Sequence, residues 1–170
     1  MTLSIGDKII LPSHGPCVID AVVDKLVGGM STRFYRLAPL EDSGGELFIP
    51  VDKITKLGIR QLLRRSEIPK LLGRLGRQAK SIILPTSARN WKQRVLDHSK
   101  LLASGSAFDL AEIIESLTEL NEARALAPHD RQTLERAKKL LICEIAEVLG
   151  ETKSAVEEQI DNALQVRRAV

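Results

Sequence analysis

A single tryptophan in a basic segment is the feature of this sequence best suited to binding chemistry. Trp91 is the only tryptophan in 170 residues, and three basic residues surround it, namely Arg89, Lys92 and Arg94. An aromatic ring among cations can stack on a base or wedge between base pairs while the cations hold phosphates. Trp91 also shares a helical stripe with Val95 and Leu102, which is the pattern of a core residue. The sequence leaves both interpretations of Trp91 open.

A second group of basic residues lies on a helix that the apolar stripe Leu134, Leu141 and Ile145 predicts over residues 128–149. This group consists of Arg131, Arg136, Lys138 and Lys139. If this helix packs beside the one that carries Trp91, these residues join the cluster at residues 89–94. The alternative is that they are plain surface charge.

The net charge of +3 is concentrated in the middle of the chain. Residues 58–106 hold eleven lysines and arginines against two acidic residues, whereas residues 1–57 and 107–170 have net charges of −1 and −5. A basic block between two such blocks favours a surface that faces a polyanion. A solvated basic face without a partner is the alternative.

Residues that could catalyse a reaction or bind a metal do not gather into a known motif. His14, His98 and His129 are far apart in the sequence, and neither Cys17 nor Cys143 shares a short metal-binding spacing with them. We find no nucleophile–base arrangement, which argues against a small hydrolase, and no phosphate-cradling glycine loop. The sequence therefore predicts a protein that is not an enzyme and that needs no metal or cofactor.

The chain also lacks features of an exported or membrane protein. Its start has no basic-then-apolar leader pattern, and no apolar run approaches the ~20 residues that span a bilayer. Two distant thiols fit a reducing compartment. We expect a cytoplasmic protein without a membrane partner, and a monomer.

Two kinds of periodicity divide the sequence. Short β-branched segments at 8–11, 16–23, 33–37 and 46–49, with Gly28-Gly29 as a turn, predict a small Tudor/SH3-like β-barrel over residues 1–57. Residues 58–66 are expected to form a short helical connection. Residues 67–170 follow a helical period, with Ser66 and Ser87 as predicted N-caps, Gly105 and Gly150 as helix ends, and Thr152 as the cap of a last helix. The predicted fold class is α+β multidomain, with the β-barrel followed by an all-α helical bundle.

Taken together, these segments resemble the CarD family of bacterial transcription regulators. In the first module the resemblance lies in Ile5-Gly-Asp-Lys-Ile-Ile-Leu-Pro-Ser-His-Gly15, Phe48-Ile-Pro-Val51 and Leu57-Gly-Ile-Arg60. In the second it lies in Asn90-Trp-Lys-Gln-Arg94, Leu102-Ala-Ser-Gly105, Asp109-Leu-Ala-Glu112 and Asp130-Arg-Gln-Thr-Leu-Glu-Arg-Ala-Lys-Lys-Leu-Leu141. The order and spacing of these motifs span nearly the whole chain.

The resemblance implies that the β module binds the RNA polymerase β subunit at its β1 lobe, through Lys25, Val27 and Phe48, to which we add Arg33 and Pro50. It further implies that the helical module contacts promoter DNA at the upstream edge of the melted bubble, largely without sequence preference. There Trp91 would be the wedge, with Arg94, Arg136 and Lys138 as its basic support. The protein would then be associated with the nucleoid through polymerase.

Two positions depart from the pattern of the resemblance. Phe48 stands where relatives often have arginine, so this polymerase contact is expected to be hydrophobic. Val95 replaces the aromatic residue common after the Trp-x-x-Arg run.

The alternative function is a general nucleic-acid-binding protein whose barrel grips RNA or DNA directly, without polymerase. The near-neutral charge of residues 1–57 argues against it.

Overall fold

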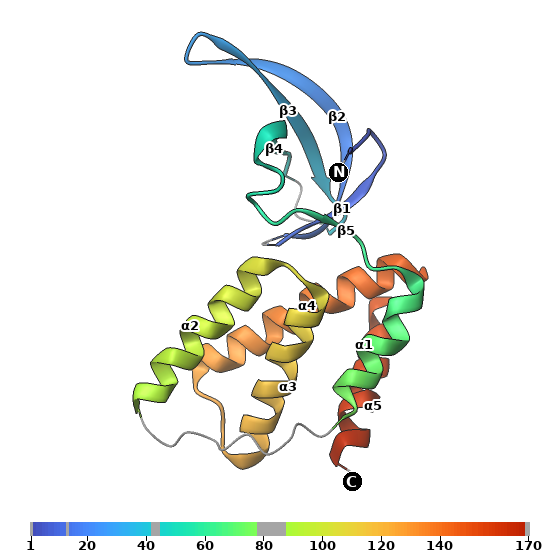
Figure 1. Cartoon of the computed structure of the whole chain (residues 1–170). Coiled ribbons are helices and arrows are strands. Elements are labelled where there is room, and N and C mark those ends of the chain that lie inside the picture. The colour runs from blue at the N-terminus through green and yellow to red at the C-terminus, as the bar shows by residue number, and fades with distance from the viewer. Residues whose placement is uncertain (1, 13, 42–44, 78–87, 169–170) are drawn as a thin grey trace. The chain divides into compact units, whose positions relative to one another are not determined.

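The chain folds into two compact units, Met1–Leu62 and Leu63–Val170. The computed structural model describes residues 2–12, 14–41, 45–77 and 88–168, with the side chains of 88–90 and 167–168 left out. Figure 1 shows a strand-rich unit followed by a helical one. This architecture confirms the predicted α+β fold class, with a Tudor-like β domain before a helical domain.

The first unit is a five-stranded antiparallel sheet with the order β4-β3-β2-β1-β5. Its strands are β1 (Lys8–Leu11), β2 (Gly15–Val27), β3 (Met30–Pro39), β4 (Leu47–Pro50) and β5 (Arg60–Gln61), with a 3₁₀ turn at Val51–Lys53. Its buried core consists of Leu3, Ile9, Leu11, Cys17, Ile19, Leu37, Ile49, Ile54 and Ile59. Strand β5 lies within the segment expected to be a connection, and it pairs with Ile9 and Ile10 of β1.

Strands β2 and β3 form a long hairpin that continues beyond its neighbours (Figure 1). Strand β1 pairs with β2 only at Gly15–Val18, and β4 pairs with β3 only at Phe34–Leu37. The hairpin turns at Gly28 and Gly29, whose φ angles are 59° and 80°, a turn conformation that glycine adopts without steric cost. Both strands run further toward this turn than the sequence pattern predicts, because the tight glycine turn keeps them paired with each other up to Val27 and Met30.

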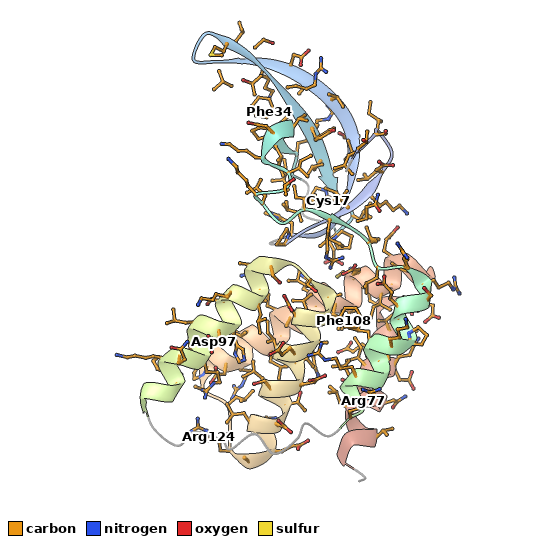
Figure 2. The ribbon with its side chains drawn as sticks, in the orientation of Figure 1. Cys17, Phe34, Arg77, Asp97, Phe108 and Arg124 are labelled. Carbon is orange, nitrogen blue, oxygen red and sulfur yellow. The ribbon has the colours of Figure 1, made fainter. Side chains whose placement is uncertain are left out.

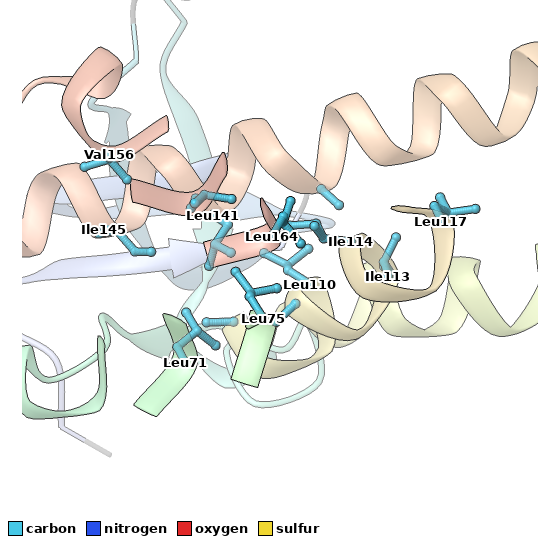
Figure 3. Close-up of a cluster of buried hydrophobic side chains, with 14 of the residues drawn as sticks. Leu71, Leu75, Leu110, Ile113, Ile114, Leu117, Leu141, Ile145, Val156 and Leu164 are labelled. Carbon is cyan, nitrogen blue, oxygen red and sulfur yellow. The ribbon is translucent and has the colours of Figure 1, made fainter. Parts of the chain in front are cut away.

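The second unit is a bundle of helices around one apolar core. Its helices are α1 (Ile68–Leu75), α2 (Ala88–Ser104), α3 (Ala107–Ala123), α4 (Pro128–Leu149) and α5 (Lys153–Arg168). Figure 3 shows the core, where Leu71 and Leu75 of α1 meet Leu110, Ile113, Ile114 and Leu117 of α3, Leu141 and Ile145 of α4, and Val156 and Leu164 of α5. Helix α2 packs against this group through Leu101 and Leu102.

The ends of several helices follow the sequence signals. Gly150 ends α4 in the left-handed conformation at φ 67°, and the Thr152 hydroxyl accepts a hydrogen bond from the Ala155 N–H at 3.2 Å. The predicted cap at Ser66 is wrong. Ser66 lies inside a 3₁₀ turn (Arg65–Glu67), where the Glu67 carboxylate accepts from the Arg64 N–H at 2.8 Å. The predicted cap at Ser87 lies outside the described residues.

Candidate interaction surfaces

Four of the five predicted polymerase contacts share one face of the hairpin. Because cross-strand partners in a sheet project to the same side, the pairs Lys25–Thr32, Val23–Phe34, Phe34–Pro50 and Arg36–Phe48 define that face. We call it the outer face, since the other side carries Leu37 and Ile49 into the core. Its apolar members are Val23, Val27, Met30, Phe34, Phe48 and Pro50. Figure 2 labels Phe34 on the hairpin.

The outer face exposes apolar side chains together with two cations, Lys25 and Arg36, of which Arg36 is paired with Asp20 at 2.7 Å. The exposed fractions are 55% for Val27, 73% for Met30 and 37% for Phe48. The Lys25 Nζ lies over the Phe48 ring, 3.4 Å from its centre. Such a pairing of an ammonium with a ring face is favourable, and it fixes two otherwise mobile side chains against each other. The outer face is therefore suited to a partner that offers apolar groups and a few acceptors.

Arg33 lies on the opposite side of the hairpin from the other four predicted contacts. It pairs with Asp24 of β2, and its Nε donates to Asp24 Oδ1 at 3.1 Å. Leu26, which is 80% exposed, and Val22 also belong to this side by the same register. The tip of the hairpin thus exposes apolar residues on both sides, but Lys25 and Phe48 meet on the outer face alone.

The ring of Trp91 is not a core side chain, since 40% of the residue is exposed in the first turns of α2. The exposed fraction falls along the same side of the helix, to 14% for the Arg94 side chain and 6% for His98. Lys92 is exposed beside Trp91 and forms no ion pair with any described residue. The core interpretation of Trp91 is therefore wrong, because the part of the apolar stripe that carries Trp91 lies at the edge of the bundle.

Arg94 forms an ion pair with an acidic residue of α4. Its Nη2 donates to Asp130 Oδ2 at 2.9 Å, and only 2% of the Asp130 side chain is exposed. Asp130 lies in the first turn of α4, where the helix dipole favours a negative charge. The contact brings the first turns of α2 and α4 together. Among the described residues, the buried Arg94 Nε and Asp130 Oδ1 have no further hydrogen-bond partner.

His98 is buried next to this ion pair. Burial lowers the pKa of His98, and the charge of Arg94 lowers it further, while Asp130 and Asp97 act in the opposite direction. His129, on the first turn of α4, also lowers the pKa of His98. Two histidines distant in the sequence thus lie close enough at the junction of α2 and α4 for their charges to interact.

The basic residues of α4 do not form one surface. Lys138 contacts Asp161 of α5 at 3.3 Å, whereas Arg131 and Arg136 are exposed and pair with no described acidic residue. At about 100° per residue, Arg136 projects roughly 140° around the helix from Arg131. Lys139 is exposed as well, and the Arg89 side chain lies outside the described part of the chain. At the same angle per residue, Arg131 lies within about 20° of Lys138, the residue that contacts α5.

No metal or nucleophile site is evident in the part of the chain that the structure describes. It contains no group of three or more histidine, cysteine, aspartate or glutamate side chains placed to hold a metal ion. Burial raises the pKa of the Cys17 thiol to about 11 and also raises that of Cys143, so both thiols are poor nucleophiles. None of the described helices combines the length and apolarity needed to cross a bilayer.

Sequence reasoning missed Asp130, Met30 and Phe34 as parts of these surfaces. An acidic residue in a first helical turn is ordinary by itself, so the burial of Asp130 is visible only in the packed structure. The signal for Met30 and Phe34 was the strand alternation. It places both residues on the same face as Lys25 once the strands are extended to a full hairpin that turns at Gly28.

The comparisons with known proteins match both units. Residues 3–63 match the family model described as "CarD-like/TRCF RID domain", and residues 83–161 match the model described as "CarD, C-terminal domain". A Bacillus subtilis (strain 168) protein named "Putative transcription factor YdeB" is 24% identical over 153 residues, which cover 90% of this chain and 96% of the relative. The two matched domains follow each other along this chain, and the alignment covers nearly the full length of that relative.

Proposed function

This chain belongs to the CarD family of transcription regulators, and from that premise we propose that it stabilises the promoter open complex. Its β unit binds the RNA polymerase β subunit at the polymerase β1 lobe. Its helical unit contacts promoter DNA at the upstream edge of the bubble. The observation that carries this proposal is the exposed Trp91 ring beside the exposed Lys92 on one unit, with an exposed apolar face on the other.

The outer face supports polymerase docking by its composition. Val27 and Met30 of the hairpin and Phe48 of β4 expose apolar surface, and the Lys25 Nζ lies over the Phe48 ring. Aromatic and methionine side chains are enriched in the cores of protein interfaces. A nucleic-acid surface would instead carry several unpaired cations, whereas Arg36 of this face is paired with Asp20. This difference favours a protein partner over the alternative, in which the β unit grips RNA or DNA.

The first turns of α2 and α4 support the contact with DNA. An exposed indole can replace the stacking lost where the duplex opens, which is worth on the order of a few kcal/mol per base step. Lys92 is exposed next to Trp91 and can approach a phosphate. Each phosphate contact lowers the log of the affinity by about 0.9 for every tenfold increase in salt concentration. Phosphate contacts carry no sequence information, so the contribution is expected to be similar across promoters.

Attachment to polymerase explains how a small DNA surface can suffice. A protein held near the bubble experiences the DNA at a high effective concentration, so weak contacts become occupied. The test is footprinting of a polymerase–promoter complex with and without the full chain, combined with the lifetime of the complex after a competitor is added. We expect protection at the upstream bubble edge and a longer lifetime. Binding to free DNA with no effect on the complex would favour the alternative.

A further inference from the structure

The first turns of α2 are attached to the bundle mainly through one polar contact. Among the described side chains that precede His98 on this helix, Arg94 and Val95 are the only two that are not exposed. Arg94 reaches across to Asp130, the most deeply buried residue in the first turn of α4. Trp91 lies one turn before Arg94 on the same side of α2, since residues three apart are neighbours on a helix surface. The Arg94–Asp130 contact therefore determines where this turn of α2 lies.

A role for Arg94 as a phosphate ligand conflicts with this contact. To reach a phosphate, the guanidinium would have to leave Asp130, whose carboxylate is 2% exposed and would remain buried without its cation. A buried charge that loses its partner is strongly unfavourable. Lys92 is exposed next to Trp91 in the sequence and carries no such constraint.

We propose that Arg94 is a positioning residue, which fixes the first turns of α2 on α4 through Asp130 and so sets the direction in which Trp91 projects. This inference rests on the proposed contact of Trp91 with DNA. A ring held in its binding direction loses less entropy when it enters the DNA than one on a mobile turn. Arg94 then affects the bubble through Trp91, without touching DNA.

Trp91 itself reports on this arrangement, because it is the only tryptophan of the chain. The variants are Asp130→Asn, which removes the acidic charge, and Arg94→Lys, which keeps a cation within reach of Asp130. Asp161→Asn is the control, since it removes the partner of Lys138 elsewhere on the bundle. The full chain is used at temperatures where its helical circular dichroism is unchanged. In Asp130→Asn we expect lower fluorescence anisotropy and stronger iodide quenching of Trp91, with Arg94→Lys and Asp161→Asn close to the parent.

The open-complex lifetime separates the two roles of Arg94. If Arg94 positions Trp91, Asp130→Asn shortens the lifetime severalfold while the salt slope of DNA binding is unchanged. If Arg94 binds phosphate, Asp130→Asn frees it, and the lifetime stays equal or increases. Arg94→Leu would in that case reduce the salt slope by about one contact. Unaltered Trp91 anisotropy and quenching in Asp130→Asn would overturn the positioning role, even if Trp91→Ala shows that the DNA contact itself exists.

Discussion

The Lys25 Nζ lies 3.4 Å from the centre of the Phe48 ring, although strand β3 separates the two strands that carry these residues. The contact therefore crosses the outer face of the hairpin. It joins two positions for which only the family resemblance had suggested a contact with polymerase. An exposed cation–π pair of this kind is worth about 0.5–1 kcal/mol. Its larger effect is to hold both side chains in one arrangement before a partner arrives.

Charge reversal at Lys25 should weaken polymerase binding. In Lys25→Glu the cation is lost from the Phe48 ring and an acidic group is placed at the centre of an apolar face. We expect affinity for RNA polymerase to fall by at least about tenfold, which corresponds to about 1.4 kcal/mol. Biolayer interferometry with the full chain and polymerase measures this change.

The matched control for that experiment is Arg33→Glu, on the opposite side of the same hairpin. Arg33 forms an exposed ion pair with Asp24, and such pairs contribute at most about 1 kcal/mol to stability. Binding should therefore change little in Arg33→Glu. If Arg33→Glu abolishes binding and Lys25→Glu does not, docking uses the side of the hairpin that carries Leu26.

Removal of the Trp91 ring should shorten the open-complex lifetime. Trp91→Ala deletes the stacking surface, and a loss of about 1.4 kcal/mol corresponds to a tenfold shorter lifetime. Affinity for polymerase should remain at the parent value, because the β unit is untouched. Leu96→Ala is the control, since Leu96 is 57% exposed on the same helix. Equal lifetimes for Trp91→Ala and Leu96→Ala would exclude the wedge.

Local patterns in the sequence were sufficient to predict much of the fold. Alternation and helical period predict β1, the middle of the hairpin and the helices after Gly105, because these elements bury one regular face. Strand β5 is two residues long and has no alternation to detect, so its pairing with β1 depends on the folded unit. The Ser66 cap failed because Ser66 lies inside the 3₁₀ turn Arg65–Glu67, which the contact between the Glu67 carboxylate and the Arg64 N–H closes.

The candidate sites depend more strongly on tertiary packing. The helical period placed Trp91 on an apolar stripe, but it could not show that the stripe leaves the bundle before that residue. Nor could it reveal that Arg94 is engaged with Asp130, 36 positions away. Residue types and spacing selected the candidate segments, whereas the division of the cations into paired and unpaired ones required the three-dimensional structure.

Breaking the Arg94–Asp130 pair should cost more stability than breaking the Lys138–Asp161 pair. Asp130→Leu leaves the Arg94 charge buried without a partner, and the loss of one member of such a pair costs about 3–5 kcal/mol. Lys138→Leu should cost at most about 1 kcal/mol, since Lys138 and Asp161 are 29% and 46% exposed. Urea unfolding followed by circular dichroism gives both values. In the double variant Arg94→Leu/Asp130→Leu most of the loss should be recovered, because no unpaired charge remains.

The stability of the helical unit should decrease as the pH falls, through His98. Burial and the charge of Arg94 lower the pKa of His98 in the folded state, whereas in the unfolded chain it returns to its ordinary value of 6.5. Below about pH 6.5 the unfolded chain therefore binds a proton that the folded chain resists, and stability is lost as the pH falls toward the folded-state pKa. Asp130, Asp97 and His129 face the same group, so the comparison is made between the parent and His98→Gln at each pH. The free energy of unfolding should fall more steeply in the parent between pH 7 and pH 5. Parallel curves for the two proteins would mean that His98 does not carry this dependence.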